Sequence, residues 1–387
     1  LPALDVPETP LPEGYTRDEV PLPELSELDL VRHYTRLSQL NYCIDTNFYP
    51  LGSCTMKYNP RVNEKAAAMP GLAQVHPLQP EETMQGSLEL MVRLQSALQE
   101  ISGFAGVSLQ PAAGAHGELT GVLMMRAYHA SRGDTRRTKM LIPDSAHGTN
   151  PASSAMAGFT SVQVPSDARG NVDLAALKAA CDDTVVGLML TNPNTLGLFE
   201  EHVVEVCETV HACGGLMYGD GANLNALLGI ARPGDLGFDV MHFNLHKTFS
   251  TPHGGGGPGS GPVGVSERLL PFLPGPIPVR DGDHYHLVMP PQSIGRVKAF
   301  FGNYGMFIRA YTFIRMHGPD GLRAIAEHAV LNANYLKAKV APHFPVAVER
   351  TCMHEFVAQG RIEGAPGIRT MDIAKRLGGR RFRHHLE

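Results

Sequence analysis

His242-Phe-Asn-Leu-His-Lys-Thr248 ends an apolar run and leads into a segment with six glycines among residues 254–261. A single lysine between a histidine and a threonine, where a strand is predicted to end, is poorly explained as solvated surface. We therefore interpret Lys247 as the candidate for the chemistry of this chain.

Upstream of Lys247, short β-prone apolar runs alternate with segments of helical character. Strands that are almost continuously apolar, and that are separated by helices, predict a parallel sheet covered on both faces. The fold class is therefore α/β with a large, mostly parallel sheet. The predicted strands are 140–142, 161–164, 185–190, 215–218 and 240–243, and the helices between them are 152–157, 174–180 and 201–212.

Polar residues follow four of these strands at the points where the strands end. Because ligands bind at the carboxyl ends of parallel strands, we expect these residues to share one edge of the sheet. For each residue alone, a role in a turn or a cap is as reasonable as a functional one. Their joint placement is the argument for a site. The residues are His147, Asn192, Asn194, Asp220 and Lys247.

A second candidate element is the run Pro111-Ala-Ala-Gly-Ala-His-Gly-Glu118, which precedes a predicted helix at 119–130. Small residues before a helix leave backbone N–H groups uncovered, and the helix N-terminus favours an anion. Gly114, Ala115 and His116 are therefore candidates to hold a phosphate. A glycine-rich helix cap without a ligand is the alternative.

These residues together suit pyridoxal 5'-phosphate, because a lysine amine forms a Schiff base with an aldehyde and this cofactor is the common protein-bound one. Asp220 can keep the pyridine nitrogen protonated, and His147 can stack on the ring. Further cofactor contacts are open between alternatives: Gly114 to His116 for the phosphate, helped by Thr248 or His246, and Asn192 or Asn194 for the ring hydroxyl.

Two other sites are considered and set aside. His242, His246 and His253 could suggest a metal, but Lys247 in their midst would repel a cation and no carboxylate completes the set. Residues 257–261 resemble a nucleotide loop only loosely, because the lysine of a P-loop and the strand–turn–helix setting are missing.

Composition bounds the remaining possibilities. The chain has 387 residues with 43% hydrophobic and 18% charged residues, and this favours a large folded domain with a smaller one. A net charge of −5 gives no reason to expect nucleic acid, and no apolar run is long enough for a membrane span. Six cysteines without a C-x-x-C pair argue against a zinc ribbon or a disulfide framework. We expect an intracellular, cytoplasmic protein.

The chain is predicted to have three parts. Residues 1–60 form a proline-rich extended arm and a polar loop that can line a site, and residues 61–294 form the large cofactor-binding domain. Residues 295–387 form a smaller C-terminal α/β domain. Its predicted elements are helices at 300–316, 321–340 and 370–377 and strand-like runs at 346–348 and 355–357.

Five motifs resemble the pyridoxal phosphate-bearing part of the glycine cleavage system P-protein family, over residues 15–375. The chain resembles the second subunit of the two-gene form, because it holds one such unit. The family continues beyond the basic end of this chain, so truncation or a divergent terminus of the small domain is expected. The motifs are Asn47–Lys57, Asp144–Pro151, Tyr218–Asn223, His242–Phe249 and Gly254–Gly261.

The resemblance implies an aspartate aminotransferase-like fold (fold type I) and the reaction of glycine dehydrogenase (decarboxylating). Glycine loses carbon dioxide, and the aminomethyl group passes to the lipoyl arm of the H-protein. A companion subunit 1, in an α2β2 heterotetramer, is also implied. The alternatives are another fold type I enzyme, such as an amino-acid decarboxylase or lyase, and a non-catalytic structural subunit.

The resemblance also assigns roles to residues. Lys247, His147 and Asp220 match the Schiff-base, ring-stacking and ring-nitrogen positions. We further expect a cofactor contact at Ala222 and a glycine or lipoyl channel lined by Ser53, Cys54, Thr55, Lys57 and Asn194.

Overall fold

The computed structural model describes residues 12–15, 17, 19–41, 45, 58–252, 259–362 and 364–383. The chain divides into two compact units, Leu1–Pro50 and Leu51–Glu387. The first unit contains α1 (Glu27–Gln39), which begins where the Ser26 hydroxyl accepts a hydrogen bond from the Asp29 N–H at 3.1 Å. The three-part division predicted above stays a prediction.

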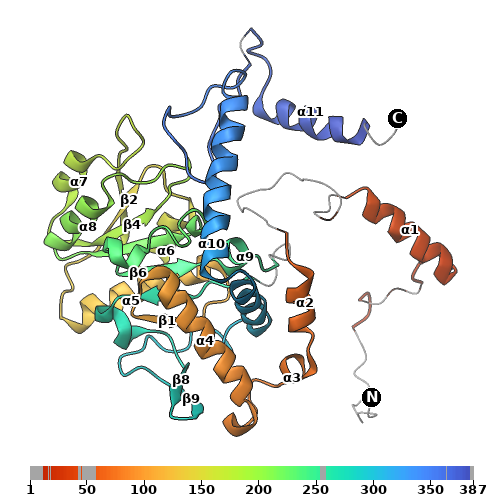
Figure 1. The fold of residues 1–387 in the computed structure, drawn as a ribbon, viewed down its shortest axis with the longest axis horizontal. Helices are drawn as coiled ribbons and strands as arrows, with labels where there is room; N and C mark the ends of the chain where they lie inside the picture. The colour runs from red at the N-terminus through yellow and green to blue at the C-terminus, as the bar shows by residue number, and fades with distance from the viewer. Residues whose placement is uncertain are drawn as a thin grey trace. The chain divides into compact units, whose positions relative to one another are not determined.

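A seven-stranded sheet lies at the centre of the second unit (Figure 1). Its strand order is β1-β7-β6-β5-β4-β2-β3, and every pair from β6 to β3 is parallel. β7 runs antiparallel to both β6 and β1. The predicted mostly parallel sheet is thus confirmed. The strands are β1 (Gly106–Ser108), β2 (Lys139–Pro143), β3 (Thr160–Val164), β4 (Val185–Thr191), β5 (Leu216–Gly221), β6 (Val240–Phe243) and β7 (Val263–Val265).

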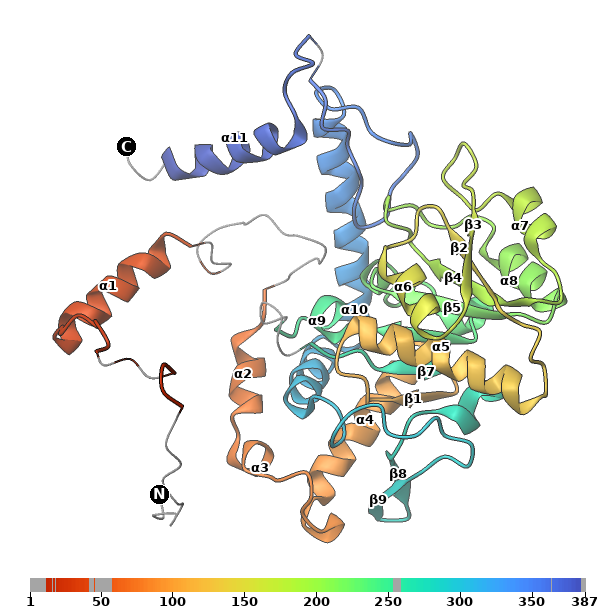
Figure 2. The same ribbon diagram turned by 180° about the vertical axis from the view of Figure 1, so that it is seen from behind.

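Helices cover both faces of this sheet (Figure 2). Each face has its own buried core. On one face Val122 and Met125 of α5 pack with Tyr218. On the other, Leu98 of α4 and Phe307 of α10 belong to the core that contains Met217. Strands buried on both sides are why the β-prone runs are almost continuously apolar. The helices are α4 (Gln85–Ser102), α5 (Gly114–Ser131), α6 (Thr149–Met156), α7 (Leu174–Ala180), α8 (Val203–Ala212) and α10 (Tyr304–Val340).

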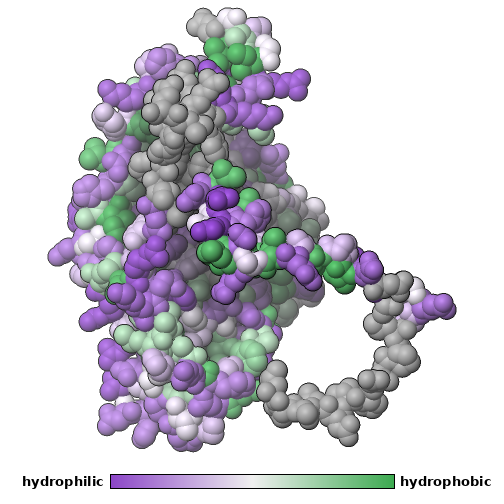
Figure 3. All heavy atoms as spheres, turned by 90° about the vertical axis from the view of Figure 1, so that its right-hand side faces the viewer, coloured by the Kyte–Doolittle hydropathy of each residue, from purple (hydrophilic) through white to green (hydrophobic). Residues whose placement is uncertain are grey.

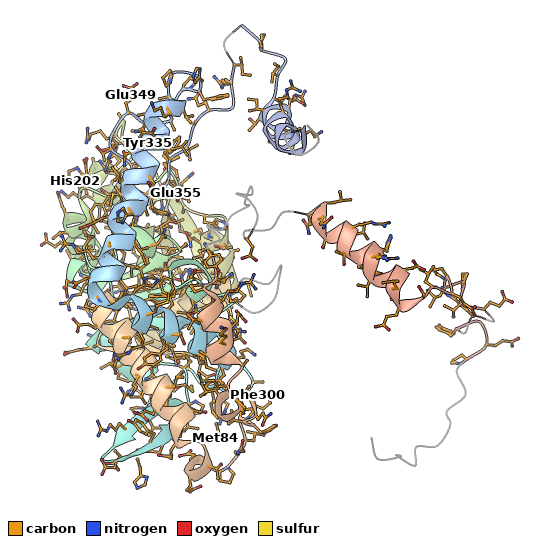
Figure 4. All side chains as sticks on the ribbon, turned by 45° about the vertical axis from the view of Figure 1, so that its right-hand side comes forward. Met84, His202, Phe300, Tyr335, Glu349 and Glu355 are labelled. Carbon is orange, nitrogen blue, oxygen red and sulfur yellow. The ribbon has the colours of Figure 1, made fainter. Side chains whose placement is uncertain are left out.

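The C-terminal region departs from expectation. The predicted strand-like runs at 346–348 and 355–357 form no strands and share a single isolated bridge, Val346 to Ala358. The predicted helices on either side of Gly318 are one element, α10, broken by Gly318 (φ 63°) before Pro319. Figure 4 shows Tyr335 on the second half of this helix. The last helix is α11 (Thr370–Arg383).

Several short elements escaped the sequence prediction. The hairpin of β8 (Ile277–Asp281) and β9 (His284–Val288) forms a separate two-stranded sheet.

The face of the molecule seen in Figure 3 mixes hydrophilic and hydrophobic residues. Within the described residues, no helix has both the length and the apolar character needed to cross a membrane. The remaining helices are α2 (Arg61–Ala67), α3 (Pro70–Ala73), α9 (Leu245–Thr248) and the 3-10 turns Glu81–Thr83, Leu224–Ala226, Pro233–Leu236 and Glu267–Phe272.

Candidate active site

A polar row crosses the middle of the sheet near the carboxyl ends of its parallel strands. Thr191 on β4 pairs in register with Asp220 on β5, and Asp220 pairs with His242 on β6. All three are buried, at 5%, 5% and 3% exposure. Buried polar groups need partners, so this row of polar side chains marks a candidate binding site within an otherwise apolar sheet.

Asp220 is held by three neighbours. Its Oδ1 accepts a hydrogen bond from the Ala222 N–H at 3.0 Å and lies 3.5 Å from His242 Nε2. Its Oδ2 accepts from Asn150 Nδ2 at 3.3 Å. The carboxylate is therefore fixed in direction before any ligand arrives. Ala222, predicted as a cofactor contact, uses its backbone N–H to fix Asp220.

His242 lies deeper, between the sheet and α5. Its Nδ1 is 2.5 Å from the Tyr218 hydroxyl, and its Nε2 is 2.8 Å from Asn244 Nδ2. Burial lowers the pKa of His242, the charge of Lys247 lowers it further, and Asp220 opposes both. Burial, with the charges of Glu118 and Asp220, holds the pKa of Tyr218 well above its usual range. A neutral imidazole therefore lies beside Asp220.

The sequence placed Lys247 at the end of a strand. It lies instead on α9, the short helix that follows β6. It is half-buried, whereas His246 and Thr248 on either side are buried. His246 Nδ1 accepts from the Ser260 N–H at 3.2 Å, which ties α9 to the chain returning toward β7. The Thr248 hydroxyl is buried and has no hydrogen-bond partner among the residues that the structure describes.

The N-terminus of α5 reaches the same edge. Its first intrahelical bond runs from the Gly117 N–H to the Ala113 carbonyl, and Ala113 has no side chain that could cap the earlier N–H groups. A Cβ at Gly114 would lie 2.3 Å from Asn244 Oδ1, so the small residue lets the helix end approach β6. His116 is half-buried, and its Nδ1 accepts from the Ala112 N–H at 3.1 Å.

His147 begins a hydrogen-bonded path into the interior. The side chain is exposed, and Nδ1 lies 2.9 Å from the Thr149 hydroxyl. Thr149 Oγ1 also donates to Glu118 Oε2 at 2.9 Å. Glu118 is 2% exposed, and burial, with the nearby charge of Asp220, raises its pKa to about 7.

The two asparagines left open for the ring hydroxyl differ in their free capacity. Asn194 accepts from the Leu196 and Leu198 N–H groups and donates to the Gly170 carbonyl, so it fastens its own loop. Asn192 accepts from the Glu200 N–H, whereas its Nδ2 is buried and has no partner in the described segments of the chain. Of the two, Asn192 has the donor to spare.

The structure thus brings His147, Asp220 and His242 to the same edge of the sheet as the start of α5 and the residues on either side of Lys247. The predicted channel residues Ser53, Cys54, Thr55 and Lys57 lie outside the described residues, as does His253. Sequence reasoning missed Glu118 and Asn150 as site residues. Both stood inside runs that had been singled out, at 111–118 and 144–151, but their partners are 31 and 70 residues away.

The residues present fit pyridoxal phosphate. An anion-favouring helix end, a buried hydroxyl without a partner at Thr248 and a fixed carboxylate at Asp220 match its phosphate and its ring nitrogen. The partnerless donor of Asn192 matches an acceptor such as the ring hydroxyl. The group would be held between α5, the end of β5 and α9.

Comparisons with known proteins show the family of the chain. The sequence model of the family described as glycine cleavage system P-protein matches residues 6–377. A protein of Halalkalibacterium halodurans named "Probable glycine dehydrogenase (decarboxylating) subunit 2" is 59% identical over 383 residues, 97% of this chain and 78% of that protein.

Two solved structures share the fold. The glycine decarboxylase (P-protein) of the glycine cleavage system, in inhibitor-bound form, superposes with a TM-score of 0.75 at 21% identity, over 90% of this chain and 80% of that one. Oryza sativa TDC with PLP and tryptamine gives 0.64 at 15% identity, over 89% and 76%. The predicted fold type I architecture is confirmed.

Proposed function

The chain belongs to the glycine cleavage system P-protein family, and we propose that it carries the chemistry of the enzyme for which its relatives are named, glycine dehydrogenase (decarboxylating). Glycine loses carbon dioxide, and the remaining aminomethyl group is transferred to the lipoyl arm of the H-protein. The observation that carries the proposal is the buried, fixed Asp220 beside His242, with Lys247 one short helix beyond the end of β6.

When bound, pyridoxal phosphate supplies an aldehyde and an electron-accepting ring for the loss of carbon dioxide. Asp220 holds a proton at the ring nitrogen, and its own position is set by Asn150 and the Ala222 N–H. Lys247 would supply the amine that binds the aldehyde carbon, and its Nζ would be the atom that takes up or gives a proton.

The anchoring of the phosphate falls to α5 and α9. The N–H groups of Gly114, Ala115 and His116 at the start of α5 and the hydroxyl of Thr248 would bind its oxygens. His147 would cover the ring from the start of α6, its imidazole oriented by Thr149. Burial on the sheet side excludes water from Asp220 and His242.

The partners and the location are part of the same proposal. Glycine is the substrate, and lipoylated H-protein is the acceptor. The relatives' name "subunit 2" supports a companion subunit, which we propose to be subunit 1 of an α2β2 heterotetramer in the cytoplasm.

The test is the covalent link between protein and cofactor. Protein reconstituted with pyridoxal phosphate should absorb in the visible, and borohydride should bleach that band and fix the cofactor to Lys247. Lys247→Ala should lose the fixed adduct. Lys178→Ala is the matched control, because Lys178 pairs with Glu205 at the surface. An adduct that persists in Lys247→Ala would refute the assignment.

A second assay addresses the reaction. Labelled bicarbonate should exchange into the carboxyl group of glycine only when lipoylated H-protein is present. Exchange that is independent of H-protein would point instead to another fold type I decarboxylase.

A further inference from the structure

Glu118 is a buried acid for which the reaction described above has no role. It lies on the first turns of α5 and is 2% exposed. Its Oε2 accepts from Thr149 Oγ1, and its Oε1 is buried without a geometrically well-formed hydrogen bond to any of the described residues. A carboxylate so placed would be costly, whereas a carboxylic acid has a proton with which to use that oxygen.

Few charged groups face Glu118. Among the described residues, β5 contributes the titratable groups in electrostatic contact with it, Asp220 and Tyr218. α6 contributes hydrogen bonds from the uncharged side chains of Ser153, Thr149 and Asn150, which lower the pKa of Glu118, but burial and Asp220 outweigh them. The nearest charge is therefore negative, and it disfavours a second negative charge on Glu118.

Asn150 connects the two acids. It is fully buried, contacts Glu118, and donates from Nδ2 to Asp220 Oδ2 at 3.3 Å. Its carbonyl oxygen Oδ1 is buried and has no donor among the residues that the structure describes. One end of the amide thus serves Asp220, and the other end needs a donor.

We propose that Glu118 is a positioning residue held as the neutral acid, which donates its proton to Asn150 and thereby fixes Asp220 as the ionised partner of the cofactor ring. The inference rests on the proposed function, since it concerns the same site. An amide has one donor end and one acceptor end, so the order Glu118 O–H to Asn150 O and Asn150 N–H to Asp220 satisfies all three groups.

The direction of this chain depends on the proton. An ionised Glu118 can only accept, so it would draw the NH2 group of Asn150 toward itself. Asn150 would then turn its oxygen toward the carboxylate of Asp220, where two acceptors would face each other. Loss of one proton at Glu118 therefore loosens Asp220 through Asn150.

The first experiment uses the protein without cofactor, so that it does not depend on the reaction. Burial raises the pKa of Glu118 from 4.5 to about 7. The stability that the protonated Glu118 contributes is fully present below about pH 4.5, and it is lost as the pH rises from there through about 7. Glu118→Gln keeps both hydrogen bonds without a titrating proton. The unfolding constant of wild type relative to Glu118→Gln should rise roughly 70-fold between pH 5 and pH 8.

Glu200→Gln is the matched control. Glu200 is also a buried acid whose pKa is raised by burial, but both of its oxygens accept backbone N–H bonds away from Asp220. If the unfolding constant of wild type relative to that of Glu118→Gln does not change with pH, the proposal is overturned, whatever the enzyme's activity.

The second experiment uses the reconstituted enzyme. The visible band of wild type should change near pH 7, the band of Glu118→Gln should not, and Glu200→Gln should follow wild type. Cofactor affinity should stay within about twofold in Glu118→Gln and fall about tenfold in Glu118→Ala. Equal losses in Glu118→Gln and Glu118→Ala would overturn the positioning role. A wild type that fails the borohydride test would refute the proposed function and leave the cofactor-free result standing.

Discussion

Thr248→Val should have opposite effects on the stability of the cofactor-free protein and on its affinity for pyridoxal phosphate. Within the described part of the chain, Thr248 Oγ1 is buried and has no hydrogen-bond partner. A buried hydroxyl without a hydrogen bond costs about 1–3 kcal/mol, and valine replaces it with a methyl group of nearly the same shape. We therefore expect the cofactor-free variant to be more stable than wild type, by about 1 kcal/mol or more.

The effect on cofactor binding should have the opposite sign. A hydrogen bond to a charged group contributes about 1.5–3 kcal/mol, so its loss should raise the Kd for pyridoxal phosphate by about 10- to 150-fold. Denaturant unfolding without cofactor measures the first effect, and titration of the visible band measures the second. The combination matters, because a simple packing defect would lower both stability and affinity.

Thr209→Val is the matched control. Thr209 lies on α8, away from the site, and its hydroxyl already donates to the Glu205 carbonyl at 2.7 Å. The same substitution there should change cofactor affinity by less than about twofold. If Thr248→Val destabilised the cofactor-free protein and left the Kd unchanged, the hydroxyl would be structural and the phosphate assignment would be wrong.

Two further substitutions test residues that lie outside the candidate site. Asp239→Ala should cost about 3–5 kcal/mol in the free energy of unfolding, because Asp239 is 2% exposed, accepts from the Met217 N–H at 2.8 Å and lies 2.7 Å from His211 Nε2. A loss below about 1 kcal/mol in denaturant unfolding would contradict this. A hydrogen bond from Cys181 lowers the pKa of Cys213 to about 6, so iodoacetamide should label Cys213 rapidly at pH 7. Cys181→Ala should raise that pKa and slow the labelling, and an unchanged rate would argue against the thiol contact.

The fold was predictable where local pattern and burial agree. All five parallel strands were recognised: β2, β4, β5 and β6 are apolar for most of their length, whereas the exposed edge strand β3 (Thr160–Val164) stands out only by its β-branched residues between helices. β1 and β7 were missed because three residues carry no period, and their place at the antiparallel edge depends on pairing with each other and with β6. The runs at 346–348 and 355–357 have strand-like composition, but only the Val346–Ala358 bridge pairs them.

The site was predictable to a similar degree. Lys247 and Asp220 could be found because a residue after a buried strand marks the carboxyl edge of the sheet. Glu118 could not be found, since an acid in the first turns of a helix is ordinarily explained by the helix dipole. Its importance arises from Thr149 and Asp220, which the fold brings to it from other elements.

The close approach of α5 joins the two halves of the site. A Cβ at Gly117 would lie 2.4 Å from the Gly261 carbonyl oxygen, and one at Gly121 would lie 2.5 Å from the Tyr218 ring. The same helix carries the N-terminus proposed to bind the phosphate and Glu118. A larger residue at either glycine would push α5 from the sheet and move both groups together. The proposed phosphate site and the proposed positioning of Asp220 therefore depend on one contact, the packing of α5 against β5 and β6.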